Sequence, residues 1–318
     1  MEEVQGDALS AFSQFNEQIF QVYKERDLFN LSQREFAGKN SGMYISDVCR
    51  RKINIHEIPY SDFKIHDELD FISKDLKYVT GVLYFLRPYI VDTRFTEGTY
   101  HQNLPDRRYL MYANFGLQSI YNFWDRIGDL IYLYFETGLP NEKVYLGRVL
   151  TNMKNPYAAD PKSIQTDAVY LELRELYENE LKPFFDERND AVHHFQLEAQ
   201  HYWGNIELRK DRPKALELNR QKHEYPEFMK RHLELFFRGY DLALRLIDRL
   251  PNRVLVFYEG DTFDEFVIDI KSVKEFEGVD LSSHFNPRDV YTLKDIAVIV
   301  AAKINVDVRL VKIFEQPK

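Results

Sequence analysis

The sequence predicts a mainly α-helical protein that ends in a small α+β unit. Up to Leu250, apolar side chains recur at three- and four-residue intervals, which is the spacing of one helix face. After Pro251 the pattern changes to short runs that are typical of strands. With only 13 Gly and 12 Pro among 318 residues, few positions interrupt these elements. We expect three parts: an N-terminal helix and irregular segment (1–65), a helical bundle (66–251) and a small α+β appendage (252–318).

In the first half of the chain, apolar residues at helical spacing predict helices over residues 8–25, 66–91, 105–135 and 142–152. Arg87-Pro88 limits the second helix, because a residue that precedes proline resists the helical conformation. Between the first two helices the chain is punctuated by glycine, asparagine and proline. We expect that stretch to be irregular, with short strands at 43–45 and 53–55.

The next helix is expected to begin near Thr166-Asp167, a suitable cap, and to run past Phe195. Pro183 lies inside it and predicts a kink or a new helix start. Pro226 is expected to open the last long helix, which ends at Leu250.

In the appendage we expect strands over 254–258 and 266–270, a helix over 292–303 and a last strand over 306–314.

Composition narrows the cellular setting. Hydrophobic residues make up 44% and charged residues 29%, the balance of a globular protein with a sizeable core. Cys49 is the only cysteine, so no disulfide can form within the chain. The acidic N-terminus lacks the order of a signal peptide, and the apolar run 296–302 is far shorter than a membrane span. We therefore expect a cytoplasmic protein without a membrane partner.

The segment from Arg188 to His194 carries the strongest chemical signal. Arg188 and Asn189 open it, and His193 and His194 close it. Arginine is a permanent cation whose fork of donors matches phosphate oxygens. Histidine can take up and return protons near neutral pH. Together they could cleave a phosphodiester without a metal.

A structural role accounts for the same residues. Arg188 falls on the apolar line of its helix, where it can extend to solvent or pair with a carboxylate, and His193 can bond to a backbone carbonyl. Geometry also limits the catalytic interpretation, since residues five apart on an unbroken helix lie roughly 140° apart. Both groups reach one phosphate only if the helix begins or distorts within the motif, or if two subunits of a dimer share the site.

The pattern Arg-Asn-(three residues)-His resembles the signature of the HEPN superfamily, a set of helical domains that includes many RNases of toxin, defence and RNA-processing systems. A long helix with Phe123-Trp124-Asp125 before the motif, and a further helix after it, are similar to the family's arrangement. The likeness covers about residues 66–250. The chain differs from many HEPN toxins in its larger size and its α+β end, which puts in doubt the antitoxin partner of those toxins.

The resemblance implies a catalytic set of Arg188, Asn189 and His193. In this scheme His193 acts on the ribose 2′-hydroxyl or on the leaving oxygen, Arg188 binds the phosphate, and Asn189 orients it. The product would be a 2′,3′-cyclic phosphate, with neither metal nor other cofactor. We expect Asp125, beside Trp124, to pair with Arg188.

Basic residues after the motif are candidates for RNA binding. Arg209, Lys210 and Arg212 form a run near Tyr202 and Trp203, and with His194 they are our candidate substrate-binding residues. Arg220, Lys222, Lys230 and Arg231 extend the run. The same run could equally be a solvated face. The net charge of -9 disfavours general nucleic-acid binding, so any contact with RNA must be local.

Three functions remain open. The first is a metal-independent HEPN endoribonuclease, homodimeric and active in stress or phage defence. The second is a non-catalytic HEPN-like scaffold that binds a nucleotide, RNA or a protein partner. The third is a metalloenzyme that uses Asp125 and Asp129, although the histidines of this region do not have a standard ligand spacing.

Overall fold

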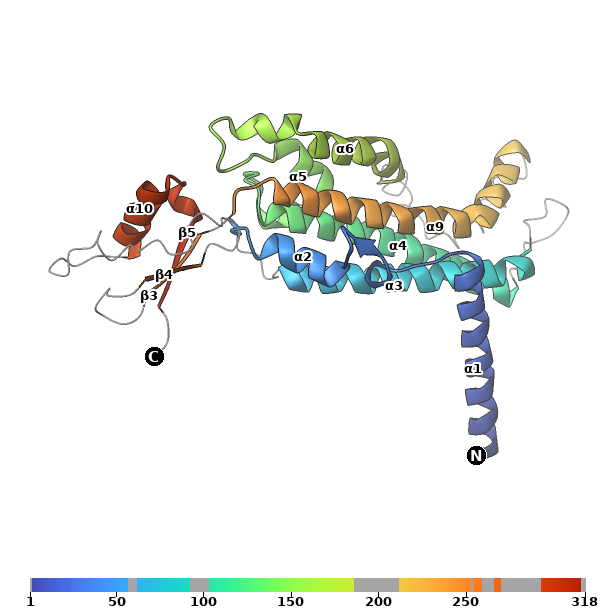
Figure 1. Cartoon of the computed structure of the whole chain (residues 1–318). Coiled ribbons are helices and arrows are strands. Elements are labelled where there is room, and N and C mark those ends of the chain that lie inside the picture. Colours follow the sequence, from blue (N-terminus) through green and yellow to red (C-terminus); the bar gives the residue numbers. More distant parts are fainter. Residues whose placement is uncertain are drawn as a thin grey trace.

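A computed structural model describes residues 2–56, 62–91, 103–185, 212–252, 254–258, 266–269 and 293–315. Figure 1 shows an elongated bundle of long helices, with α1 projecting from one end and a small sheet with α10 near the other. None of the described helices combines the length and apolar character that crossing a membrane requires. The predicted fold class, a mainly α-helical bundle, is confirmed.

Three long helices form the core of the bundle: α3 (Asp62–Leu86), α4 (Leu104–Tyr132) and α9 (Arg212–Asp248). Phe123 of α4 stacks on Phe236 of α9 with ring centroids 3.6 Å apart. Gly239 of α9 lies so close to Trp124 of α4 that a Cβ at this glycine would be 2.3 Å from the indole ring. These two helices therefore pack at close range around Trp124, and α3 contacts both.

Two shorter helices cover α4 and α9 on one side. They are α5 (Leu146–Asn152) and α6 (Ala168–Leu176), and the 3-10 turns between α4 and α6 are Asn141–Lys143 and Pro161–Thr166. The side chain of Asp167 caps α6 by accepting a hydrogen bond from the backbone of Val169 at 2.8 Å. The expected start of this helix is therefore confirmed, whereas α5 begins four residues later than expected.

The N-terminal part contains α1 (Glu2–Glu25) and α2 (Ser41–Cys49), joined by a 3-10 turn (Leu31–Gln33) and a two-stranded ribbon, β1 (Glu35–Phe36) and β2 (Lys39–Asn40). The strand expected at 43–45 is wrong, because these residues lie in α2. Asn40 caps this helix by accepting from the Met43 backbone at 2.8 Å. Tyr44, Ile45 and Val48 are buried at helical spacing.

The last helix of the bundle does not begin at Pro226 as expected. It begins at Arg212, so the proline lies inside it. A proline has no N–H to donate to the carbonyl four residues earlier, which here belongs to Lys222. That carbonyl instead accepts the hydroxyl of Tyr109, on α4, at 2.6 Å. A donor from the neighbouring helix thus replaces the missing helical bond.

In the C-terminal part, strands β3 (Val254–Tyr258), β4 (Phe266–Asp269) and β5 (Val311–Glu315) form a sheet in the order β4-β3-β5. The first two strands are antiparallel, and β5 is parallel to β3. A parallel neighbour needs a crossover, and α10 (Leu293–Ile304) lies on that connection. The last strand is shorter than expected because a 3-10 turn, Val308–Leu310, precedes it.

Candidate functional site

The motif segment lies between the end of the helix that follows α6 and the start of α9. Residues 186–211, which hold Arg188, Asn189, His193, His194, Arg209 and Lys210, are outside the described residues. Arg212 is the first residue of α9, and its side chain is likewise not described. The structure describes the chain on both sides of the motif: the end of the helix that precedes it and the start of α9, which follows it.

The helix that enters the motif is distorted just before it. Residues Tyr177–Leu181 form a π-helical turn, in which the Lys182 N–H bonds to the Tyr177 carbonyl five residues back. Pro183 follows, and it has no N–H for the carbonyl of residue 179. Such π turns occur often at functional sites because they shift the faces of the helix relative to an unbroken one. The π turn lies before Pro183, and residues 182–185 continue as regular helix, so no new helix starts at the proline. The kink expected at Pro183 stays a prediction.

Two consecutive phenylalanines fix the chain as it reaches the motif. Phe185 packs edge-on against Tyr121 of α4, with ring centroids 5.5 Å apart. Phe184 turns to α9, where it contacts Phe228 at 5.6 Å and His232 at 5.2 Å. The entry to the motif is thus held between α4, from earlier in the chain, and α9, which follows the motif.

His232 is an aromatic partner of this entry that the sequence analysis did not single out. Its side chain is buried, and its Nδ1 has no hydrogen-bond partner among the described residues. Burial, with a smaller contribution from Arg231, lowers the pKa of His232 to about 3. At neutral pH it therefore packs as an uncharged ring. The sequence does not distinguish His232 from the histidines of the motif, because its burial comes from residues that pack on it from other parts of the chain.

Asp125, the expected partner of Arg188, lies on α4 one helical turn after Tyr121. Tyr121 contacts Phe185, which lies three residues before Arg188 in the sequence. Asp125 is therefore on the same helix, α4, that contacts the chain just before the motif. Its side chain is half-buried. The pairing itself involves a residue outside the described ranges and stays a prediction.

Beyond the motif, the first turns of α9 are held by a buried ion pair. Lys222 Nζ lies 2.5 Å from Asp106 Oδ1, and both side chains are fully buried. The same ammonium donates to the Val91 carbonyl at 2.8 Å. Asp106 also belongs to the capping box of α4, in which its backbone N–H donates to the Asn103 side chain at 2.8 Å. The exit from the motif is therefore fixed to the start of α4.

The described members of the extended basic run are mostly paired within the fold. Arg220 bonds to Glu217 at 2.6 Å and to Glu224 at 2.8 Å. Arg231 pairs with Glu180, and Lys222 is the buried cation described above. Lys222 and Arg231 thus connect α9 to other elements, and Arg220 is paired with carboxylates of its own helix, so none of the three has an unpaired charge. The role of Arg209, Lys210 and Arg212 remains a prediction.

The carboxylates of α4 have structural partners. Asp129 forms an ion pair with Arg126 at 2.5 Å, and burial raises the pKa of Asp129 to about 6. Arg126 also contacts Glu68 of α3 at 3.3 Å. Within the described ranges, no three His, Cys, Asp or Glu side chains come close enough to hold a metal ion. The metalloenzyme interpretation thus gains no support from the described part of the chain.

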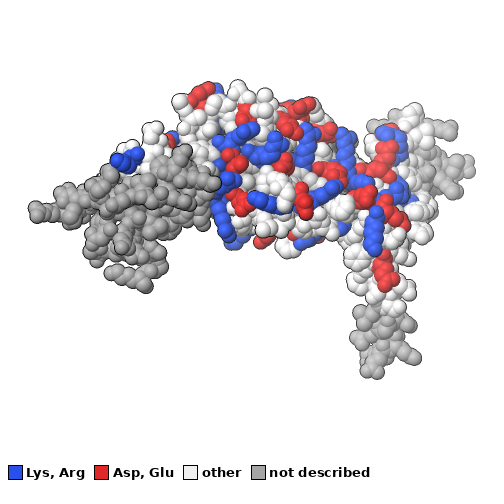
Figure 2. All heavy atoms as spheres, in the orientation of Figure 1, with Lys and Arg blue, Asp and Glu red and all other residues white. Residues whose placement is uncertain are grey.

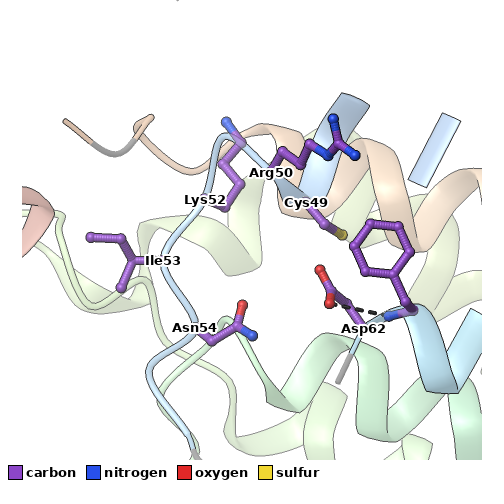
Figure 3. A pocket seen from close by; sticks show the side chains of 7 residues that line it. Cys49, Arg50, Lys52, Ile53, Asn54 and Asp62 are labelled. Atoms are coloured by element: carbon purple, nitrogen blue, oxygen red, sulfur yellow. Dashed lines mark hydrogen bonds between the residues drawn. The ribbon is translucent and has the colours of Figure 1, made fainter. Parts of the chain in front are cut away.

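A hollow of about 330 Å³ lies where α2 ends and α3 begins. Figure 3 shows the Cys49 sulfur turned toward the Asp62 carboxylate and the Lys52 amine turned away. Asp62 accepts hydrogen bonds from the Phe63 backbone and from the Tyr134 hydroxyl, each at 3.1 Å, and burial raises the pKa of Cys49 to about 12. Cys49, Lys52 and Asp62 are thus partnered or shielded, and we assign no ligand to this hollow.

Lys52 shows that the hollow is far from the motif. Its amine bonds to the Asp248 carbonyl at 3.0 Å and to the Asn252 side chain at 2.9 Å, where α9 ends. The entry to the motif contacts α9 at Phe228, 20 residues earlier, which is about 30 Å along a helix.

Comparison with known proteins is consistent with the fold. The family model for the Cthe2314-like HEPN family matches residues 67–248, more than half of the chain. The matched range includes α4, the motif segment and α9. Searches of curated proteins and of solved structures found no match. The resemblance stated from the motif is confirmed, and the chain belongs to the HEPN superfamily.

Proposed function

We propose that this protein is a metal-independent endoribonuclease of HEPN type that acts in stress or phage defence. The observation that carries the proposal is the Arg-Asn-(three residues)-His segment, which lies inside the range matched by the HEPN family. The π turn at Tyr177–Leu181 supports it in a general way, because such turns occur often at functional sites. Arg188 and His193 reach one phosphate if the chain departs from a regular helix within the motif, or if a second copy supplies one of the two side chains.

In the proposed reaction the ribose 2′-oxygen attacks the adjacent phosphorus, and the bond from phosphorus to the 5′-oxygen breaks. The 2′-hydroxyl gives up its proton and the leaving 5′-oxygen gains one. His193 serves one or both transfers. Arg188 stabilises the charge on the non-bridging oxygens, and Asn189 orients the phosphate. The products are a 2′,3′-cyclic phosphate and a 5′-hydroxyl.

Neighbouring residues complete the proposed site. Asp125 would hold the Arg188 guanidinium in place from α4. His194, Arg209, Lys210 and Arg212 would contact the RNA backbone around the scissile phosphate. The proposed enzyme is a homodimer, in which a second copy can supply part of the site.

The test is incubation of the purified protein with total RNA in excess EDTA. We expect cleavage to persist, to produce 2′,3′-cyclic phosphate ends, and to fall by about 10²-fold or more in His193→Ala and Arg188→Ala. Arg220→Ala is the matched control, because it removes an exposed arginine that is paired outside the motif. Loss of activity in the control at the level of Arg188→Ala would contradict the assignment. So would activity that depends on a divalent cation.

A non-catalytic scaffold is the second candidate, favoured by charge. The net charge is -9, and the face in Figure 2 has acidic and basic side chains interspersed rather than one basic field. RNA gains most of its affinity from clustered Lys and Arg, so such a face favours a protein or nucleotide partner. If RNA stays intact with high concentrations of the folded wild-type protein, and equally with motif variants, the result would support this function over the first.

A further inference from the structure

Helix α1 has an apolar stripe that continues past its own bundle. Ile19 is buried against α3, and Phe15 packs edge-on against Phe85 at 5.4 Å. Phe12 falls on the same stripe one turn earlier, by the three- and four-residue spacing of a helix face. Its side chain is 63% exposed. Figure 1 shows why: this half of α1 extends away from the other helices.

The outer face of the α3–α4 pair has a second unpartnered apolar stripe. On α4, Leu104, Met111 and Phe115 are all exposed and share one face at intervals of seven and four residues. On α3, Phe71 is 62% exposed, and Tyr78 is exposed beside it, one heptad later. Tyr78 contacts Tyr112 of α4, which joins the two stripes into one surface. We call this surface the α3–α4 face.

The acidic half of α1 and the α4 part of the α3–α4 face have opposite charge, whereas the α3 part contains Asp75 between Phe71 and Tyr78. Residues 1–23 contain four acidic side chains and no Lys or Arg: Glu2, Glu3, Asp7 and Glu17. Arg108 lies within the α4 stripe, four residues after Leu104, and Arg107 is next to it. Both arginines are exposed, and neither forms an ion pair within the described part of the chain.

The dimensions also agree. The free half of α1, residues 2–14, is about 20 Å long, and the stripe from Leu104 to Phe115 is about 17 Å long. Because α1 is one continuous helix that is anchored at Ile19 and directed away from the bundle, it cannot turn back onto its own α3–α4 face. A second copy of the chain can present that face to it.

We propose that the protein forms a symmetric dimer in which the N-terminal half of each α1 docks on the α3–α4 face of the other copy. The exchange buries Phe12 against Met111 and Phe115 of the partner copy and brings the acidic end of α1 to Arg107 and Arg108. Two identical docking sites form at once, as a twofold axis requires.

This surface does not rest on RNA cleavage. A dimer that leaves RNA intact would support the surface and contradict the nuclease. RNA cleavage by a protein whose association is unchanged in Phe12→Glu and in Phe115→Glu would do the reverse.

The test is the oligomeric state of the full-length chain, measured by sedimentation equilibrium over a wide concentration range. We expect a dimer whose Kd rises about tenfold or more in Phe12→Glu and in Phe115→Glu, because each places a charge in an apolar contact. Phe20→Glu is the matched control. It changes the same residue type on the same helix at 59% exposure, but about 100° from Ile19 around the helix.

Mixing the two weakened variants tests the exchange itself. In a mixed dimer, the unchanged α1 of the Phe115→Glu chain docks on the unchanged α3–α4 face of the Phe12→Glu chain. One of the two docking sites is therefore intact, and the mixture should dimerise more strongly than either variant alone. A wild-type protein that is monomeric at every concentration would overturn the proposal, even if its α1 were found to bind another protein or a lipid surface. Equal weakening by Phe20→Glu, or a mixture no stronger than its components, would overturn it too.

Discussion

The buried pair of Lys222 and Asp106 makes a quantitative prediction about what holds the bundle around the motif. Replacing Lys222 by methionine keeps the length of the side chain but removes the ammonium. The variant loses the 2.5 Å contact to Asp106 and the 2.8 Å bond to the Val91 carbonyl. It also leaves a fully buried carboxylate with weaker donors, the backbone N–H groups of Val91 at 3.2 Å and Asn103 at 3.4 Å.

Removing one member of a buried ion pair costs about 3–5 kcal/mol, most of it from the charge left behind. We therefore expect Lys222→Met to lower the free energy of unfolding by that amount in urea denaturation. Asp106→Asn in the same chain removes the unpaired charge and should recover a substantial part of the loss, so the two changes are not additive.

Arg220→Met is the control for this experiment, since it breaks an exposed pair on the same helix. It should leave the unfolding midpoint unchanged within error. A loss of less than about 1 kcal/mol in Lys222→Met, or strict additivity with Asp106→Asn, would refute the argument that burial makes this pair necessary.

Two further predictions concern the packing around the entry to the motif. The pKa of His232 is lowered from 6.5 to about 3, so below pH 6.5 the unfolded chain binds a proton that the folded chain does not. Stability should therefore fall by about 1.4 kcal/mol per pH unit toward pH 3 from this group, and His232→Phe should remove that part of the slope in acid unfolding curves. An unchanged slope would contradict the burial of a neutral ring. Gly239→Ala places a Cβ 2.3 Å from the Trp124 ring, and we expect it to destabilise the protein by about 1–3 kcal/mol in thermal unfolding. Gly38→Ala has open space around its Cβ but a φ of +75°, so its cost should come from backbone strain alone and should not alter Trp124 fluorescence.

Regular helices could be read from the chain because their signals are local. The stripe of α4 and its stop before Gly138, the Asp167 cap of α6, and the strands that follow Pro251 each depend on residues within one or two turns. The same holds for the motif, whose residue types and spacing fit within six positions of the matched range.

Errors arose where a distant residue completes a local arrangement. Pro226 has the local pattern of a helix start, yet it lies within α9 because Tyr109, more than a hundred residues away, bonds to the carbonyl that the proline leaves free. The strand expected at 43–45 failed differently. Its three apolar residues fit a strand as well as a helix, and the cap formed by Asn40 three residues earlier favours the helix.

The sequence alone determined the helical class, the order of most elements and the Arg-Asn-His segment, because spacing and residue type act over a few positions. The tertiary structure alone decided which charges are free and which are buried. Lys222 and Arg220 are two basic residues two positions apart in one helix, and nothing in the chain separates them. One is enclosed by α4 and paired with Asp106, while the other is solvated. Burial depends on what packs from elsewhere in the chain, and it sets the energy of a charge.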